Sequence, residues 1–174
     1  MRRMVFCLAA ALTANMAWAQ PQPVVHTSSL LATDGKEAGK ITLTEAAKGV
    51  ILRVEATGLR EGWHAVHFHE KGSCDVKDKF KEAGGHVHTA MPVVHGLLNS
   101  DANDQGDLTN IYAGADGKAN AEIYSTLVSV NPGSSRPALL DGDGSTVIIH
   151  ANADDYQSQP IGGAGDRVAC AVIK

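Results

Sequence analysis

The stretch "KITLTEAAKGVILRVEATGL" (residues 40–59) decides the fold class of this chain. Apolar residues occupy every second position on both sides of "AAKG", and polar or charged residues stand between most of them. Because successive side chains of a β-strand point to opposite faces, this alternation predicts two strands joined by a short turn, each with one buried face.

Short runs of the same kind recur along the chain as "HAVHFH" (64–69), "ANAEIYS" (119–125), "STVIIHA" (145–151) and "RVACAVI" (167–173). No long stretch has the 3.6-residue period of an amphipathic helix. Short strands without helices favour an all-β domain, an antiparallel sandwich or barrel.

Three long stretches rich in glycine and polar residues separate these runs, at 71–118, 131–145 and 152–166. Connections of this length are uncommon in compact domains unless they are functional or disordered. Several histidines fall at strand ends or inside these stretches, so we expect bound metal and a disulfide to hold the loops.

The first residues, "MRRMVFCLAAALTANMAWAQ" (1–20), have the pattern of a secretory signal. Two arginines precede a short apolar run, and Ala17 and Ala19 provide the small residues that a signal peptidase requires. We therefore expect a signal peptide at residues 1–19, cleaved after Ala19, and a single domain at 20–174. The apolar run is too short to span a bilayer, so no membrane segment is expected in the mature form; a buried N-terminal helix is the alternative.

The charge and the cysteines of the chain narrow the function further. The net charge is −4, and the signal peptide carries two arginines and no acid, so the mature domain is more acidic still. The absence of a basic patch argues against nucleic acid as a partner. Cys74 and Cys170 remain after Cys7 is removed with the signal, and in an exported chain we expect them to pair; two free thiols are the alternative.

The segment "WHAVHFHEKGSC" (63–74) holds three of the eight histidines. On a strand His67 and His69 share one face, about 6.5–7 Å apart along the chain, which is a chelating arrangement. Further histidines follow at strand ends and in loops: His86 after "AGG", His95 ahead of Asp107, and His150 at the end of an apolar strand. Imidazoles suit copper, zinc or nickel, and carboxylates favour zinc, but spacing alone assigns neither metal.

Six separated motifs then occur in a familiar order: "GWHAVHFHEKGSC", "AGGH", "HG", "GDL", "VIIHANADDY" and "GGAGDRVACAVI". Together they resemble the copper–zinc superoxide dismutases in their bacterial exported form, over nearly the whole mature chain. The resemblance implies an eight-stranded antiparallel Greek-key β-barrel with two long functional loops, located in the periplasm. It also implies conversion of superoxide to dioxygen and hydrogen peroxide by Cu(II)/Cu(I) cycling.

The resemblance assigns roles to individual residues. It implies copper ligands at His67, His69, His86 and His150, and zinc ligands at His86, His95 and Asp107. His86 would bridge the two metals and carry a proton in catalysis, and Arg167 would draw the anionic substrate to copper. Asp154 would connect ligands of the two metals by hydrogen bonds, and Cys74 would pair with Cys170.

Three positions depart from the pattern of the family. Asp104 stands where the family has a third zinc-binding histidine, so either this aspartate ligates zinc or it is loop surface and zinc is weak or absent. His88 replaces an aspartate or asparagine and is either a substitute ligand or a loop side chain. Ala65 replaces a glycine that the family favours.

Two questions stay open from the sequence. A non-catalytic periplasmic protein of the same fold that binds copper or zinc is the alternative function, with Asp104 as its only support. The chain also leaves open whether the mature protein is a homodimer or a monomer.

Overall fold

Nine β-strands and one short 3₁₀ turn form the secondary structure of residues 24–174, the part of the chain that the computed structural model describes. They are β1 (Val25–Ala32), β2 (Glu37–Ala46), β3 (Gly49–Ala56), β4 (Gly62–His64), β5 (Val66–His69), η1 (Lys81–Ala83), β6 (Ile111–Ala113), β7 (Ala119–Ser125), β8 (Ser145–His150) and β9 (Arg167–Ile173). Among these residues, no helix has the length and apolar character needed to cross a membrane. The predicted signal peptide and Cys7 lie outside the described residues.

The alternating stretch at residues 40–59 forms the hairpin of β2 and β3, as predicted. Leu43 lies opposite Leu52 and Ile41 lies opposite Val54, and all four side chains are fully buried. Arg53, between two of these buried positions, points to solvent. The period of two in the sequence is therefore the period of burial in the sheet.

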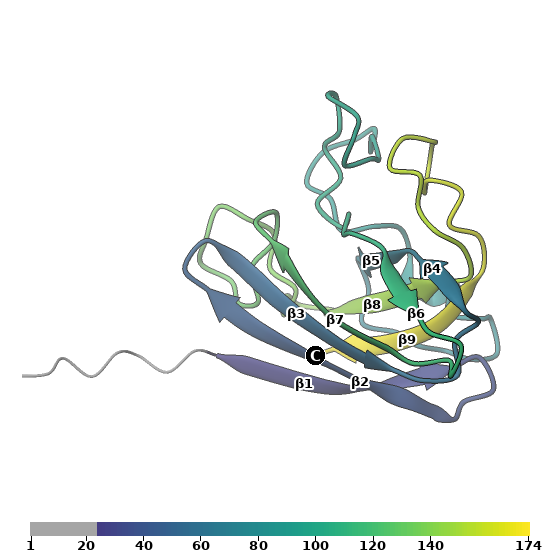
Figure 1. The fold of residues 1–174 in the computed structure, drawn as a ribbon. Coiled ribbons are helices and arrows are strands. Elements are labelled where there is room, and N and C mark those ends of the chain that lie inside the picture. The colour runs from purple at the N-terminus through teal and green to yellow at the C-terminus, as the bar shows by residue number, and fades with distance from the viewer. Residues whose placement is uncertain (1–23) are drawn as a thin grey trace, which may run out of the picture.

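Seven strands form one antiparallel sheet in the order β5-β8-β9-β1-β2-β3-β7, and β4 pairs with β6 in a short separate ribbon. The large sheet is strongly curled, and the β4–β6 ribbon lies across its open side (Figure 1). β1 neighbours β9 and β3 neighbours β7, so the chain crosses between distant strands as in a Greek key. One apolar core fills the inside of the curl.

The strand count is nine where the resemblance implies eight, because one extended segment changes partners. Residues 62–64 pair with β6 and residues 66–69 pair with β8. Ala65 lies between them; its N–H donates to the carbonyl of Asn152 and its own carbonyl accepts from the N–H of His150. Counted as one continuous strand, 62–69 restores the expected eight.

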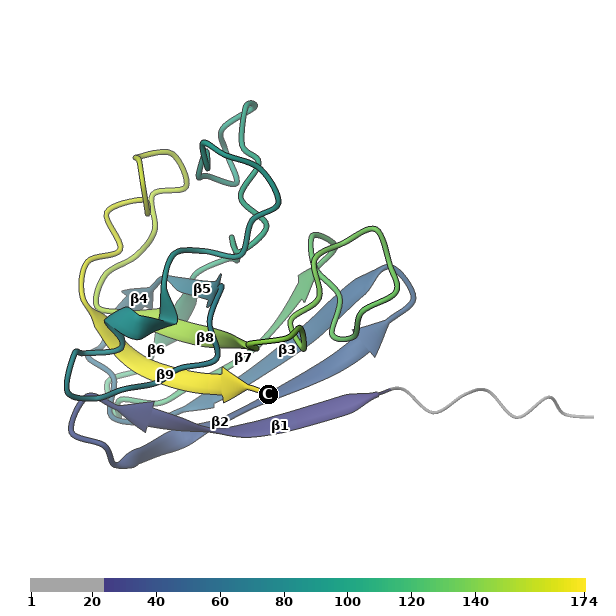
Figure 2. The same ribbon diagram turned by 180° about the vertical axis from the view of Figure 1, so that it is seen from behind.

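Two long connections rise from the same end of the curled sheet, one after β5 and the other after β8 (Figures 1 and 2). They contact one another, since the N–H of Leu98 donates to the carbonyl of Tyr156 at 3.1 Å. The stretch 71–118, described above as a connection between strands, also contains η1 and β6, which the sequence did not predict. The strands that supply histidines therefore end beneath two loops that touch.

A disulfide joins Cys74 to Cys170, as predicted, with 5.7 Å between the Cα atoms. Cys170 lies in β9 and packs in a small apolar cluster with Phe80, Ala83 and Ile148. The bridge thus attaches the start of the first long loop to the sheet.

Candidate metal centre

Four buried histidines meet at the end of the curled sheet. His67 and His69 come from β5, His150 ends β8, and His86 comes from the first long loop. One ring nitrogen from each lies within 4.8 Å of the others, so the four can share one ion. His67 and His69 point to the same side of β5, as the period of the strand predicts.

The hydrogen bonds of these rings leave one nitrogen free on each. Nε2 of His67 donates to Oδ2 of Asp154 at 2.9 Å, and Nδ1 of His69 and His150 donates to the carbonyls of Gly84 and Gly165. The remaining nitrogens, Nδ1 of His67 and Nε2 of the other three, are buried without a hydrogen-bond partner. Buried polar atoms are rarely left unpaired, and neutral imidazoles with an outward lone pair are good metal donors.

His64 does not join this cluster, although it is the third histidine of the same sequence motif. Its ring is buried between two backbone carbonyls, those of His150 and Arg60, each 2.7 Å from a ring nitrogen. Its parity on the strand differs from that of His67 and His69, and the structure places it on the other side, where it fastens the neighbouring loop to β8.

A second cluster lies on the other side of the His86 ring. His86 Nδ1 is 2.7 Å from Oδ2 of Asp104 and 3.5 Å from Oδ1 of Asp107. His95 Nδ1 is 3.6 Å from the same Asp104 oxygen and 2.6 Å from the same Asp107 oxygen. Ligand atoms about 2 Å from a tetrahedral zinc are about 3.3 Å apart, and these four nitrogen–oxygen distances lie near that value.

Asp104 is built into this cluster and is not loop surface. The residue is 4% exposed, and its second oxygen, Oδ1, accepts the N–H of Gly106 at 2.9 Å. A backbone bridge between Asp104 and His88 holds the residue beside the segment that carries His86. A ring nitrogen of His67 also lies within 4.8 Å of donor atoms of His86, His95 and Asp107, although Nε2 of His67 bonds Asp154.

The protonation of the two clusters differs in the absence of metal. Burial lowers the pKa of His69 well below its ordinary value and lowers that of His150 to about 3, so both rings are neutral. Burial also lowers the pKa of His95, but hydrogen bonds to Asp104, Asp107 and Asp154 outweigh it and raise the pKa to about 11. The pKa of His86 is raised for the same reason, against the effect of burial.

Asp154 connects the clusters, as the resemblance implies. Its carboxylate accepts from His67 Nε2 at 2.9 Å and from His95 Nε2 at 3.0 Å. Gly162 packs against it so closely that a Cβ atom there would lie 1.7 Å from Oδ1 of Asp154 and 2.9 Å from Nε2 of His95. This glycine also has a φ of 61°, so the loop over the carboxylate needs a residue without a side chain.

Two residues that the sequence analysis did not single out hold Asp154 in place. The side chain of Asn110 accepts the N–H of Asp154 and donates to its carbonyl, both at 2.9 Å. The N–H of Tyr156 donates to Oδ1 of Asp154 at 2.6 Å, and its phenol oxygen accepts the N–H of Asn110 at 2.7 Å. No sequence signal separates Asn110 from other loop asparagines, because its role depends on two loops meeting.

Arg167 begins β9 beside the first cluster and is held by the first long loop. Its guanidinium donates to the carbonyls of Phe80 and Gly84, at 2.5 and 2.6 Å. Gly84 is also the acceptor for His69, so the arginine and a histidine of the first cluster share one carbonyl. An open pocket of about 250 Å³ borders the arginine and is lined by Lys79, Lys81, Gly165, Asp166 and Arg167.

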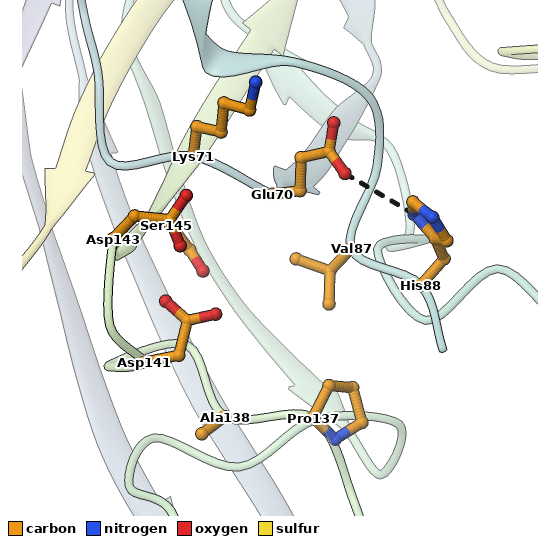
Figure 3. Close-up of a pocket in the computed structure, with 9 residues that line it drawn as sticks. All are labelled: Glu70, Lys71, Val87, His88, Pro137, Ala138, Asp141, Asp143 and Ser145. Carbon is orange, nitrogen blue, oxygen red and sulfur yellow. Dashed lines mark ion pairs between the residues drawn. The ribbon is translucent and has the colours of Figure 1, made fainter. Parts of the chain in front are cut away.

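His88 lies outside both clusters. Its Nδ1 donates to the carbonyl of His86 at 2.8 Å and is 3.8 Å from Oε2 of Glu70. Figure 3 shows the two residues on the wall of a separate surface pocket of about 370 Å³, which contains none of the donor side chains. Of the two readings of His88, the structure favours a loop side chain.

A curled antiparallel β-barrel with two adjacent donor clusters that share one histidine defines a metalloprotein with a paired metal centre. Residues 37–173 match the family model of copper/zinc superoxide dismutase. The superoxide dismutase [Cu-Zn] of Caulobacter vibrioides is 64% identical over 148 residues, which are 85% of this chain and 84% of that protein.

Solved structures agree with this relationship. A SOD-like protein from Bacillus subtilis superposes with a TM-score of 0.77 at 35% identity, covering 86% of this chain and 98% of that one. The Cu/Zn superoxide dismutase from Brucella abortus gives 0.69 at 28% identity, covering 87% and 100%. The chain belongs to the copper/zinc superoxide dismutase family. It is an enzyme of that family with superoxide as its substrate and copper and zinc as its cofactors, and the non-catalytic alternative is not favoured.

Proposed function

We propose that superoxide is dismuted at a copper ion bound by His67, His69, His86 and His150. The observation that supports this assignment is the set of four buried ring nitrogens, without hydrogen-bond partners, that lie within 4.8 Å of one another. Four imidazoles suit copper, which when bound supplies the one-electron oxidation and reduction that two superoxide ions require.

We further propose a zinc site formed by His86, His95, Asp104 and Asp107. Zinc has no accessible redox step, so its contribution is to order the loop and fix the orientation of His86. The spacing of the four donor atoms and the burial of both aspartates support this set. Asp154 is proposed to orient His67 and His95 from behind.

His86 and Arg167 are the proposed catalytic residues. The Nε2 atom of His86 faces the first cluster and its Nδ1 faces the second, so this ring can hold one of the two protons that hydrogen peroxide needs while Nδ1 stays fixed. The guanidinium of Arg167 is aimed by two carbonyls and supplies a fixed positive charge beside the same cluster. In an acidic protein such a local charge raises the encounter rate with an anion.

Export to the periplasm is proposed together with cleavage of residues 1–19 after Ala19. The charged start, the apolar run and the small residues before the cleavage position support it, and the Cys74–Cys170 disulfide fits an oxidising compartment. Sequencing the N-terminus of protein from the periplasmic fraction tests both points. Sedimentation of that protein over a range of concentrations distinguishes a monomer from a homodimer.

Metal analysis of selected variants, combined with superoxide consumption, tests the proposed sites. The mature protein should hold one copper and one zinc per chain and consume superoxide. His69→Gln should lose copper and activity but keep zinc, because His69 belongs only to the first cluster. His95→Gln should preferentially lose zinc, and His88→Gln should keep both metals. Full copper loading with negligible turnover would contradict the proposal.

A further inference from the structure

The two donor clusters share His86 but differ in the chemistry of their other atoms. The first cluster offers only imidazole nitrogens, whereas the second combines two nitrogens with the carboxylate oxygens of Asp104 and Asp107. Copper(II) binds more tightly than zinc to most sites of either kind, so separating the two metals depends on ligand type and geometry. Asp104 supplies one of the two oxygens and thereby increases this difference.

The surroundings of Asp104 make its position fixed before any metal arrives. One carboxylate oxygen accepts the N–H of Gly106, which leaves Oδ2 directed at Nδ1 of His86 and of His95. The backbone bridge to His88 restrains the same residue from the other side. These contacts hold the carboxylate of Asp104 beside the two histidines of the second cluster.

The donor types of the second cluster act against copper(II). Two of its four donors are carboxylate oxygens, which suit copper(II) less well than imidazole nitrogens do. A histidine at 104 would make the second cluster richer in nitrogen and so more similar to the first.

From these observations we propose that Asp104 sorts the two metals: it lowers the preference of the second cluster for copper and so directs copper to the four histidines. This inference rests on the proposed ligand role of Asp104 and extends it from binding to selectivity. The occupants it separates are copper(II) and zinc.

The first experiment uses the metal-free mature chain without substitution. One equivalent of copper(II) is added in the absence of zinc, and the electron paramagnetic resonance spectrum is recorded. Sorting predicts the signal of an isolated copper ion with nitrogen ligands and no loss of intensity. Two copper ions on opposite nitrogens of His86 would couple and reduce the signal, so a coupled pair at one equivalent would overturn the proposal.

The second experiment compares variants by competition between copper and zinc at the second cluster, with the first cluster already filled by copper. Asp104→His should raise the ratio of copper to zinc affinity about ten-fold or more, a difference of about 1.4 kcal/mol. Asp101→Asn, an exposed position in the same loop, should leave the ratio unchanged. An equal ratio in the unsubstituted chain and in Asp104→His would reject the sorting role.

Zinc binding by Asp104→Asn distinguishes the proposed role of Asp104 as a zinc ligand from its proposed role in selectivity between the metals. If this variant binds zinc as tightly as the unsubstituted chain, Asp104 is not a ligand and the proposed zinc site itself fails. If zinc affinity falls but the ratio of copper to zinc affinity stays equal to that of the unsubstituted chain, the ligand role stands and sorting does not. Circular dichroism of each variant confirms that the fold is retained.

Discussion

At the scale of single residues, the hydrogen bonds that fix each ring matter as much as the rings themselves. His67, His69 and His150 each use one nitrogen to bond a protein oxygen, and the other is left for the ion. The resemblance in sequence supplied these positions, but spacing alone supported only the pair on β5. The sequence could not decide whether Asp104 was a donor, because its neighbours His86 and His95 are 18 and 9 positions away.

Replacement of Arg167 by alanine should lower the rate of superoxide consumption about ten-fold or more and flatten its dependence on ionic strength. The reason is the loss of the only arginine that the structure places at the first cluster within residues 24–174. Pulse radiolysis over a series of salt concentrations measures both effects. Arg53→Ala is the matched control, because it removes a positive charge from an exposed position of β3. An unchanged rate in Arg167→Ala would remove this residue from the mechanism.

Zinc binding should release protons and strengthen as the pH rises. The pKa of His95 is about 11 in the metal-free protein, so this ring is protonated at pH 7 and zinc must displace its proton; the pKa of His86 is also raised, by hydrogen bonds to Asp104 and Asp107. Affinity should rise about ten-fold per pH unit for each proton released.

Calorimetry in buffers of different ionisation enthalpy counts these protons directly. Copper added to the zinc-loaded protein serves as the comparison. It should release fewer protons than zinc does, because burial already keeps His69 and His150 neutral. Equal proton release by the two metals would contradict this assignment of charge.

At the scale of strands and loops, the sequence predicted those strands whose own residues carry the pattern of burial. The alternation found β2, β3, β7, β8 and β9, because each buries one face or both against the core. It missed β1, which alternates weakly, and the three-residue β6, which exists because it pairs with β4. Strands made by a distant partner leave little trace in their own sequence.

The contact between the two long loops gives a prediction at this scale. Asn110→Ala should remove both hydrogen bonds to the backbone of Asp154 and leave its N–H and carbonyl unpaired, which costs about 1–3 kcal/mol for a buried group. Because Asp154 orients a histidine of each cluster, we expect the affinity for both metals to fall about ten-fold.

Metal retention against a chelator and thermal unfolding of the loaded protein measure these two effects. Asn120→Ala, at an exposed position of β7, is the control. If Asn110→Ala loses stability but keeps both metal affinities, the hydrogen bonds between Asn110 and Asp154 support the fold and not the metal site.

At the scale of the whole molecule, the disulfide attaches the first long loop to the sheet. Its two cysteines are 96 positions apart, and closing a loop of that length stabilises the folded chain by about 4–5 kcal/mol in the chain-entropy model. Replacing both cysteines by serine should lower the free energy of unfolding of the metal-free protein by up to that amount. Urea denaturation measures it; an unchanged midpoint would show that packing around Phe80 is sufficient.

The peptide oxygen of Gly84 accepts hydrogen bonds from both His69 and Arg167. The residue proposed to attract the anion and one of the proposed copper ligands are therefore positioned by the same peptide group. A displacement of this peptide group would disturb both tasks at once, so natural variation in the loop cannot adjust one of them independently. Selection should accordingly treat the segment around Gly84 as a unit, tolerating change at its outward side chains but not in the path of its backbone.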